Sequence, residues 1–242
     1  VGDTFLACLQ CGTCTSVCPW NLVSSYSPRQ IMRQLNLKSG TQQALDQAVW
    51  TCVTCNACGV NCPRGIEIID VMRAVRELNI TSGRIPESFE LPFDSLKDNG
   101  NPWGGVREKR LEWAGDLDIP AFTPEHEYCL FTCCTTAYDV SNRKAGQALP
   151  QLLESAGVSF GTLGIEESCC GDQANKMGAD EIFSELARKN TELFLQAGAQ
   201  TILTTSPHCL NAFKNNYAGL QGSVSSEHYT ELLDRLLEEG RL

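Results

Sequence analysis

Apolar residues in the first third of the chain recur every three or four positions, which is the spacing of an amphipathic helix. Ser27-Pro28 begins one such helix, because Pro is favoured at the first helical position. Thr41 begins a second helix, and a third runs from about Glu67 to Leu78. The residues expected to line the buried faces of these helices are Ile31, Met32 and Leu35, then Ala44, Leu45, Ala48 and Val49, and finally Ile68, Val71, Met72 and Val75.

Beyond residue 126 the pattern changes to short apolar runs that alternate with longer amphipathic stretches. The runs predict strands at Glu127–Phe131, Val158–Leu163 and Thr201–Thr205. The amphipathic stretches predict helices at Asn142–Ala156, Ala179–Ala197 and Tyr229–Glu239. Pro150 should kink or shorten the first of these helices. Such alternation favours a parallel sheet covered by helices.

The stretch at 81–125 carries Gly, Pro and Trp with little regular apolar spacing. We interpret it as a linker that wraps over one or both domains, with a short helix near Val106–Ala114. The predicted organisation is therefore a helical domain at 1–80, the linker at 81–125, and an α/β domain at 126–242. The α/β domain should hold a small parallel sheet flanked by helices.

Composition excludes several classes of protein. The 242 residues are 42% hydrophobic and 20% charged, as in ordinary folded proteins. The net charge of −10 argues against nucleic-acid binding, which needs a basic surface. No run of 18 apolar residues predicts a membrane span, and no secretory signal is visible. The chain begins with Val1, which suggests a processed or partial chain.

Fourteen cysteines are the most informative feature of the composition. Without an export signal, such tight clusters favour metal or redox chemistry over disulfides. Eight of them form two copies of the pattern Cys-x2-Cys-x2-Cys-x3-Cys-Pro, which is the run found in bacterial ferredoxins. The first copy is Cys8, Cys11, Cys14, Cys18 and Pro19, and the second is Cys52, Cys55, Cys58, Cys62 and Pro63.

The spacing within each run predicts which cysteines share a cluster. Three thiolates two residues apart can wrap three corners of one cube, whereas the fourth lies too far along and reaches the other cube. One [4Fe–4S] cluster is therefore assigned to Cys8, Cys11, Cys14 and Cys62, and the other to Cys52, Cys55, Cys58 and Cys18. Zinc is the alternative, but zinc sites use four ligands, usually in two pairs, and have no need of the third step.

The remaining cysteines belong to the α/β domain. Cys133-Cys134, Cys169-Cys170 and Cys209 each follow a predicted strand. Sites in such folds are built at the carboxyl ends of the strands, so these five should converge on one edge of the sheet. Cys129 lies inside a predicted strand and is expected to be a small core residue.

The arrangement resembles a known family. The first group of cysteines, from Cys8 to Cys62, resembles the helical ferredoxin module of succinate dehydrogenase iron–sulfur subunits and heterodisulfide reductases. The second resembles the CCG module of heterodisulfide reductases, with Cys134, Cys169-Cys170-Gly171 and Ser206-Pro207-His208-Cys209 at matching spacings. Further resemblance lies in the strings YSPRQIMRQL, WTCVTCNACGVNCPRGIEIIDVMRAVREL, GNPWG, TTAYDV, LGIEESCCGD and TTSPHCLNAFKNNY.

The resemblance implies a third metal site. In the family, the CCG module holds a non-cubane [4Fe–4S] cluster with five cysteine ligands, where a disulfide is cleaved. The carried-over catalytic residues are Cys134, Cys169, Cys170 and Cys209, with Cys133 as a substitute fifth ligand. Ser206 replaces the first cysteine of the last motif, and serine is a harder ligand than thiolate. An ordinary cube, zinc, a disulfide or a pair of buried cysteines therefore stay open for this site.

Other residues near the CCG cysteines have two interpretations. His208 could donate a proton during disulfide cleavage or be an ordinary neighbour of the site. Glu166 and Glu167 are expected to cap a helix or face solvent. His126 and His228 have no visible partners. No Gly-x-Gly-x-x-Gly opens a helix after a strand, so neither a flavin nor a nicotinamide site is expected.

The sequence thus predicts an electron-transferring iron–sulfur subunit of a heterodisulfide reductase-like complex, passing electrons through two cubes to a CCG site. The alternative is a non-catalytic relay or docking subunit with an altered CCG module, serving a flavoprotein or a membrane quinone-linked oxidoreductase. Expected partners are a flavoprotein, a second CCG-containing subunit or a membrane cytochrome, and a small-molecule disulfide. The expected location is the cytoplasm, with membrane association through a partner subunit. Substrate, electron donor and direction of flow do not follow from the sequence.

Overall fold

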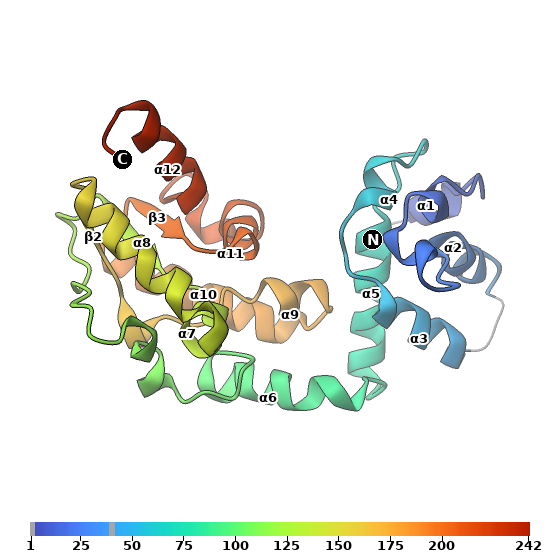
Figure 1. The fold of residues 1–242 in the computed structure, drawn as a ribbon. Coiled ribbons are helices and arrows are strands. Elements are labelled where there is room, and N and C mark those ends of the chain that lie inside the picture. The colour runs from blue at the N-terminus through green and yellow to red at the C-terminus, as the bar shows by residue number, and fades with distance from the viewer. Residues whose placement is uncertain (1–2, 39–41) are drawn as a thin grey trace. The chain divides into compact units, whose positions relative to one another are not determined.

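The computed structural model describes residues 3–38 and 42–242. Its chain divides into two compact units, shown in Figure 1. The first contains residues 1–85 and 175–180, and the second contains 86–174 and 181–242. None of the helices in the described residues is both long and apolar enough to cross a membrane.

The first unit is helical, as the apolar spacing predicts. Its 3-10 turns are Asp3–Ala7 and Pro19–Leu22, and its helices are α1 Thr13–Ser16, α2 Pro28–Leu37, α3 Gln42–Thr51, α4 Ala57–Val60 and α5 Ile68–Thr81. The start of α2 at Pro28 and the buried face of α5 confirm the predictions for those helices. The predicted start at Thr41 lies outside the described residues.

Cysteines take part in the core of this unit. The buried centre combines α2 and α5 side chains such as Met32 and Met72, at 1% and 0% exposure, with Cys58. Further cysteines, each partly buried, pack against that centre. They are Cys8, Cys14, Cys18, Cys52 and Cys62. The residues that could bind metal therefore also help to pack the unit.

Ser27 caps helix α2. Its side chain accepts a hydrogen bond from the backbone N–H of Gln30, and Pro28 occupies the first helical position. Because an N-cap side chain satisfies an otherwise unpaired N–H, we expect Ser27→Ala to lower the free energy of unfolding by about 1 kcal/mol. Ser27→Asp keeps an acceptor and should retain most of the stability. Denaturant unfolding of the two variants tests this, and equal loss in both would contradict the capping role.

The second unit is built on a four-stranded parallel sheet. Its strands are β1 Tyr128–Phe131, β2 Phe160–Gly161, β3 Thr201–Thr204 and β4 Ser225–His228, in the order β2-β1-β3-β4. Its helices, together with those where the chain joins the first unit, are α6 Glu90–Asn99, α7 Cys134–Tyr138, α8 Arg143–Ser155, α9 Asp172–Lys176, α10 Asp180–Gln196, α11 Pro207–Asn211 and α12 Tyr229–Glu238.

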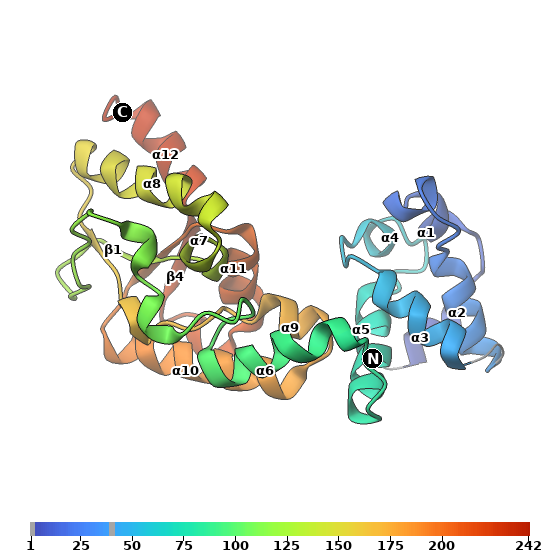
Figure 2. The same ribbon diagram turned by 60° about the horizontal axis from the view of Figure 1, so that its bottom comes forward.

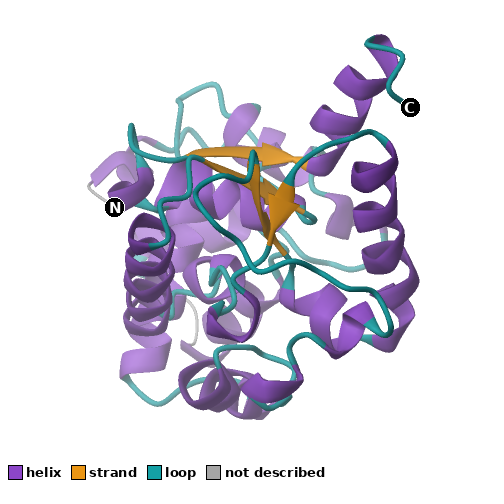
Figure 3. Cartoon of the chain, turned by 90° about the vertical axis from the view of Figure 1, so that its left-hand side faces the viewer, coloured by secondary structure: helices purple, strands orange, loops and turns teal. Residues whose placement is uncertain are grey.

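Helices cover both faces of this sheet, which Figure 3 shows at the centre of its surrounding helices. Figure 2 shows α8 and α12 on one side of the strands and α10 on the other. The α8 and α12 side is aliphatic, with Leu153, Leu203 and Leu236 at its core. On the other side, Phe131 of β1 meets Phe194 of α10 edge to face, with ring centroids 5.9 Å apart. The predicted fold class, a helical domain and an α/β domain, is confirmed.

Several elements differ from the prediction. β2 is shorter than expected because only Phe160 and Gly161 pair with β1, and Thr162 bridges to Ala121 instead. β4 is absent from the prediction because its residues, Ser-Ser-Glu-His, are polar and only partly buried at the edge of the sheet. α8 spans almost the whole predicted range, so Pro150 does not shorten it.

The stretch expected to be a linker contains regular structure. Helix α6 occupies Glu90–Asn99 and buries Phe93 and Leu96, which are three residues apart. Pro92 does not prevent this helix, because Pro is tolerated in the first turn. Gly100 ends it in the left-handed conformation. The short helix expected near Val106–Ala114 consists of two 3-10 turns, at Arg107–Lys109 and Glu112–Ala114.

Candidate metal centres

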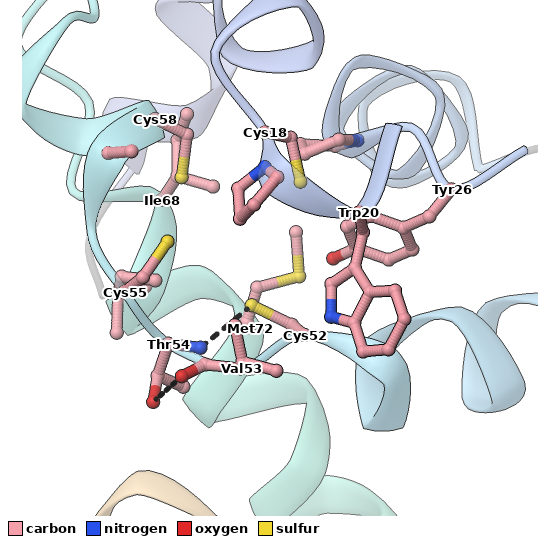
Figure 4. Close-up of a pocket in the computed structure, with 14 residues that line it drawn as sticks. Cys18, Trp20, Tyr26, Cys52, Val53, Thr54, Cys55, Cys58, Ile68 and Met72 are labelled. Atoms are coloured by element: carbon pink, nitrogen blue, oxygen red, sulfur yellow. Dashed lines mark hydrogen bonds between the residues drawn. The ribbon is translucent and has the colours of Figure 1, made fainter. Parts of the chain in front are cut away.

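The eight ferredoxin-type cysteines lie around two pockets of the first unit. One pocket is lined by Cys18, Cys52, Cys55 and Cys58. The other is lined by Cys8, Cys11, Cys14 and Cys62. Each pocket thus gathers three cysteines of one run and the fourth cysteine of the other run. Figure 4 shows the side chains of the first pocket.

The two cysteine loops share one backbone conformation. Between the first and second cysteines, Gln10 and Thr54 both adopt positive φ, at 56° in each case. Between the second and third, Gly12 and Asn56 do the same, at 89° and 61°. The third cysteine of each run then lies in a one-turn helix, α1 or α4. Left-handed residues turn the chain sharply, so each loop can curve around a compact group.

Polar hydrogens in these loops are directed at sulfur. The backbone N–H of Thr54 donates to Cys52 Sγ at 3.4 Å, and Gln10 Nε2 donates to Cys8 Sγ at 3.3 Å. Burial raises the pKa of the Cys58 thiol to about 12. A thiol in such a place stays protonated unless a metal displaces the proton, because coordination requires the thiolate.

Two buried donors fit a cluster in the pocket of Cys18, Cys52, Cys55 and Cys58. Trp20 and Tyr26 line the same pocket. The indole Nε1 of Trp20 and the hydroxyl of Tyr26 are buried, and neither makes a well-formed hydrogen bond within the described part of the chain. Buried donors normally have partners, and the sulfurs of a cluster would supply them. This pocket therefore suits a group that accepts hydrogen bonds.

A buried guanidinium lies behind that pocket. Arg76 of α5 is 0% exposed and donates to the backbone carbonyls of Val49 and Cys52. Its guanidinium carbon lies 5.5 Å from the ring centroid of Trp50. Burial lowers the pKa of Arg76, and the nearby Cys52 sulfur and Tyr26 act in the opposite direction. The sequence offered no signal for this residue, because its contacts come from distant positions.

In the second unit, five buried cysteines are close enough to shift one another's pKa values, and we call this group the thiol ring. Cys134 Sγ lies 3.7 Å from Cys169 Sγ. In addition, the pKa of each thiol is shifted by its neighbours, with Cys170 acting on Cys169, Cys209 on Cys170, and Cys133 on both Cys134 and Cys209. All five are buried, at 1–8% exposure. The cysteines expected at the carboxyl edge of the sheet are thus brought together.

The ring divides its thiols into two kinds. Hydrogen bonds from Cys134 and Cys209 lower the pKa of Cys133, and hydrogen bonds from Cys169 and Cys209 lower that of Cys170 to about 6. The partners that donate, Cys134 and Cys209, have raised pKa values for the same reason. The ring therefore favours a mixture of thiolate and thiol. Among residues 3–38 and 42–242, no three His, Cys, Asp or Glu side chains are arranged to hold a single metal ion.

Ser206 and Cys133 have different places at this site. The Ser206 side chain accepts a hydrogen bond from the N–H of His208 and caps α11. Cys133 supplies the fifth sulfur of the ring, between Cys134 and Cys209. The Ser206 side chain therefore caps a helix, and the additional cysteine, Cys133, comes from the loop after β1.

An ion pair is buried beside the ring. Arg110 Nη2 lies 3.1 Å from Glu167 Oε2, and the two side chains are 2% and 1% exposed. Glu167 also accepts from Thr162, and Arg110 donates to the carbonyl of Thr132. The expectation that Glu167 faces solvent is wrong, although its neighbour Glu166 is exposed. Its carboxylate does bond to a helix end, because Oε1 accepts from the N–H of Leu163, which precedes the 3-10 turn Gly164–Glu166. Burial raises the pKa of Glu167, and Arg110 opposes that rise.

His208 is held by a buried carboxylate. Its Nδ1 lies 2.9 Å from Oδ2 of Asp172, which is 1% exposed, while the imidazole side chain is 56% exposed. Asn211 donates to the other oxygen of Asp172. Asp172 was not singled out in the sequence, although it directly follows the Cys-Cys-Gly motif. His126 and His228 bond only to neighbouring polar groups such as Thr123 and Thr230 in the interactions found. Cys129 is fully buried in β1.

Comparison with known proteins matches both units. Residues 4–66 match the family described as 4Fe-4S dicluster domain, and residues 128–214 match the family described as cysteine-rich domain, CCG. EtfAB:quinone oxidoreductase of Syntrophomonas wolfei is 35% identical over 204 residues, which are 81% of this chain and 29% of that protein.

Two further relatives cover almost the whole chain. The probable iron-sulfur-binding oxidoreductase FadF of Bacillus subtilis is 29% identical over 98% of this chain and 42% of its own length. The dihydromethanophenazine:CoB–CoM heterodisulfide reductase of Methanosarcina barkeri has one component that is 27% identical over 98% of this chain and 64% of its own length. The chain thus spans less than two thirds of the length of these curated relatives.

A helical dicluster domain joined to an α/β domain with a cysteine ring defines an iron–sulfur oxidoreductase subunit. Within that class, the chain belongs to the heterodisulfide reductase-like family, as the two domain matches and the named relatives together show.

Proposed function

We propose that this chain is the electron-transferring subunit of a redox complex, with two cubane clusters in its helical unit and a disulfide-active site at the thiol ring. Cys8, Cys11, Cys14 and Cys62 would hold one cube, and Cys18, Cys52, Cys55 and Cys58 the other. When bound, such clusters accept and release single electrons. The observation that carries the proposal is the grouping of the eight cysteines in two pockets with crossed membership.

The thiol ring supports the second part of the proposal. Cys133, Cys134, Cys169, Cys170 and Cys209 offer five sulfurs in one buried place, which suits a multi-iron group that needs several thiolate ligands. The reaction proposed there reduces a disulfide, R–S–S–R, with two electrons and two protons to two thiols. A redox partner delivers the electrons. Asp172 holds the exposed imidazole of His208 beside Cys209, where it can give a proton to a thiolate product.

The names of the relatives support a proposal for the partners and the location of this protein. One relative is named for quinone and EtfAB, one as a probable membrane-anchored ferredoxin, and others as heterodisulfide reductase subunits. A flavoprotein donor, a second CCG-containing subunit or a membrane cytochrome would each fit a chain without a flavin fingerprint. We propose that the protein works in the cytoplasm and lies at the membrane when its partner is anchored in the membrane.

Metal analysis tests the proposal directly. We expect anaerobically purified protein to contain about twelve irons, about four for each of three clusters. Low-temperature EPR of dithionite-reduced protein should show the two cubes, and oxidised, thiol-treated protein should show a further signal. About eight irons, with or without one zinc, and no signal in the oxidised sample would mean that the chain holds two cubes and no catalytic cluster. No iron would overturn the whole proposal.

Turnover separates catalysis from relay. We expect Cys170→Ala to abolish reduction of a small disulfide by the chemically reduced protein while the signals of the two cubes remain. Cys129→Ala, which removes a buried cysteine outside the ring, is the matched control and should keep the activity. Full turnover in Cys170→Ala would mean that the ring is not the site of reduction, and no turnover by the unmodified chain would favour the second candidate, a relay subunit. The capping role of the Ser206 side chain is the observation that favours that candidate.

A further inference from the structure

The two cysteine pockets of the helical unit differ in the polar groups that surround them. The pocket of Cys18, Cys52, Cys55 and Cys58 contains the buried donors of Trp20 and Tyr26. Figure 4 shows both rings beside Cys18 and Cys52, with the phenol oxygen and the indole nitrogen directed toward the pocket rather than away from it. Among the described residues, no indole or phenol lines the other pocket.

Charge is distributed unequally as well. Arg76 is buried close to Cys52, and in the interactions found its nitrogens donate to carbonyl oxygens rather than to carboxylates. Arginine stays protonated in proteins, so this is a fixed positive charge. The other pocket has two arginines in its lining, Arg29 and Arg64, but both are exposed. Water and salt screen exposed charges much more than buried ones.

We propose that Trp20, Tyr26 and Arg76 make the cluster at Cys18, Cys52, Cys55 and Cys58 the more easily reduced of the two, and so the electron-accepting end of the pair. The inference rests on the proposed function, because it requires a cluster in each pocket. Reduction adds one negative charge to a cluster. Hydrogen-bond donors to its sulfurs and a buried cation stabilise that charge and therefore raise the reduction potential. The described lining of the opposite pocket has no buried cation, and its side-chain groups beside sulfur, Gln10 at Cys8 and Thr13 at Cys11, are only partly buried.

The assignment gives the helical unit a direction. An electron that enters at the cluster of Cys8, Cys11, Cys14 and Cys62 would move spontaneously to the second cluster. The second cluster would therefore be the one that passes the electron to the next acceptor.

An EPR-monitored redox titration of the full, anaerobically reconstituted chain tests the inference. Cys55→Ser identifies the signal of the second cluster, because a serine ligand alters its spectrum. We expect that signal to have the higher midpoint. The variants Tyr26→Phe and Trp20→Phe keep aromatic rings and lose the donors. Combined, the two substitutions should lower the ratio of reduced to oxidised second cluster about tenfold at a fixed potential, which is about 59 mV for one electron. The signal of the cluster at Cys8, Cys11, Cys14 and Cys62 should stay unchanged.

Controls separate this inference from the proposed function. Tyr138→Phe removes a hydroxyl that bonds to Val106 and lines neither pocket, so both midpoints should stay fixed. Arg76→Gln should shift the same signal as Tyr26→Phe, while Arg76→Lys keeps the charge and should shift it less. If both clusters are present but the substitutions leave the midpoints unchanged, or if the order of the two midpoints is reversed, this inference is wrong and the proposed function stands. Protein without cluster signals would overturn the proposed function instead.

Discussion

Glu167→Gln is expected to destabilise the α/β unit by about 3–5 kcal/mol, the cost of leaving a buried charge without its partner. Arg110 and Glu167 are almost fully buried, and the carboxylate is the acidic group paired with that guanidinium at 3.1 Å. Whole domains are stable by only about 5–15 kcal/mol, so this loss is a large fraction of the total. Urea unfolding followed by circular dichroism measures it.

Glu166→Gln provides a matched control for this substitution. Glu166 is the preceding residue and is exposed, so the same chemical change should alter stability by no more than about 0.5 kcal/mol. If Glu167→Gln does not fold, the double variant with Arg110→Met removes both charges and should recover folded protein. Equal stability of the Glu166 and Glu167 variants would show that the pair is not needed to hold Arg110.

Substitution of Cys18 is expected to remove the cluster assigned to the second cysteine run, although Cys18 belongs to the first. Its sulfur lines the pocket of Cys52, Cys55 and Cys58. We expect Cys18→Ala and Cys55→Ala each to lower the iron of the helical unit from about eight to about four and to abolish the same EPR signal.

The reciprocal variant tests the same crossing from the other side. Cys62→Ala should abolish the signal that Cys11→Ala abolishes, because these two residues share the other pocket. Should the alanine variants lose both clusters through unfolding, serine at the same positions keeps a weaker ligand and permits the assignment by spectral change. A Cys18 variant that behaves like the Cys11 variant would rule out crossed ligation.

Local spacing was enough to predict much of the helical unit. The steps of three along each cysteine run, and the steps of three or four along α5, describe contacts within a few residues. These short-range patterns indicated the helices. They also indicated the two groups of four cysteines, each with three members from one run and one from the other, that line the two pockets. The alternation of strands and helices likewise predicted the parallel sheet. β4 was not predicted because an edge strand that is only partly buried needs no apolar alternation. α6 was not predicted because its stretch contains Gly, Pro and Trp with little regular apolar spacing.

The electrostatic surroundings of the sites could not be predicted in this way. Arg110 lies 57 positions from Glu167, and Arg76 lies 27 positions from the carbonyl of Val49. Nothing in local composition marks such residues, because their burial depends on how distant elements pack. Glu167 was misassigned for this reason. Its sequence neighbours resemble a solvated acidic turn, whereas its real partners, Arg110 and Thr162, belong to other parts of the fold.

Cysteines in the core of the helical unit have a consequence for the life of the protein in the cell. Six thiols occupy or border its buried centre, and Gln10, Thr54 and Asn56 hold left-handed backbone that costs free energy. Metal binding to such a unit is part of its folding free energy. We therefore expect its abundance to follow the supply of newly assembled clusters. During iron starvation or exposure to oxygen, proteases would clear the chain before any loss of its gene expression.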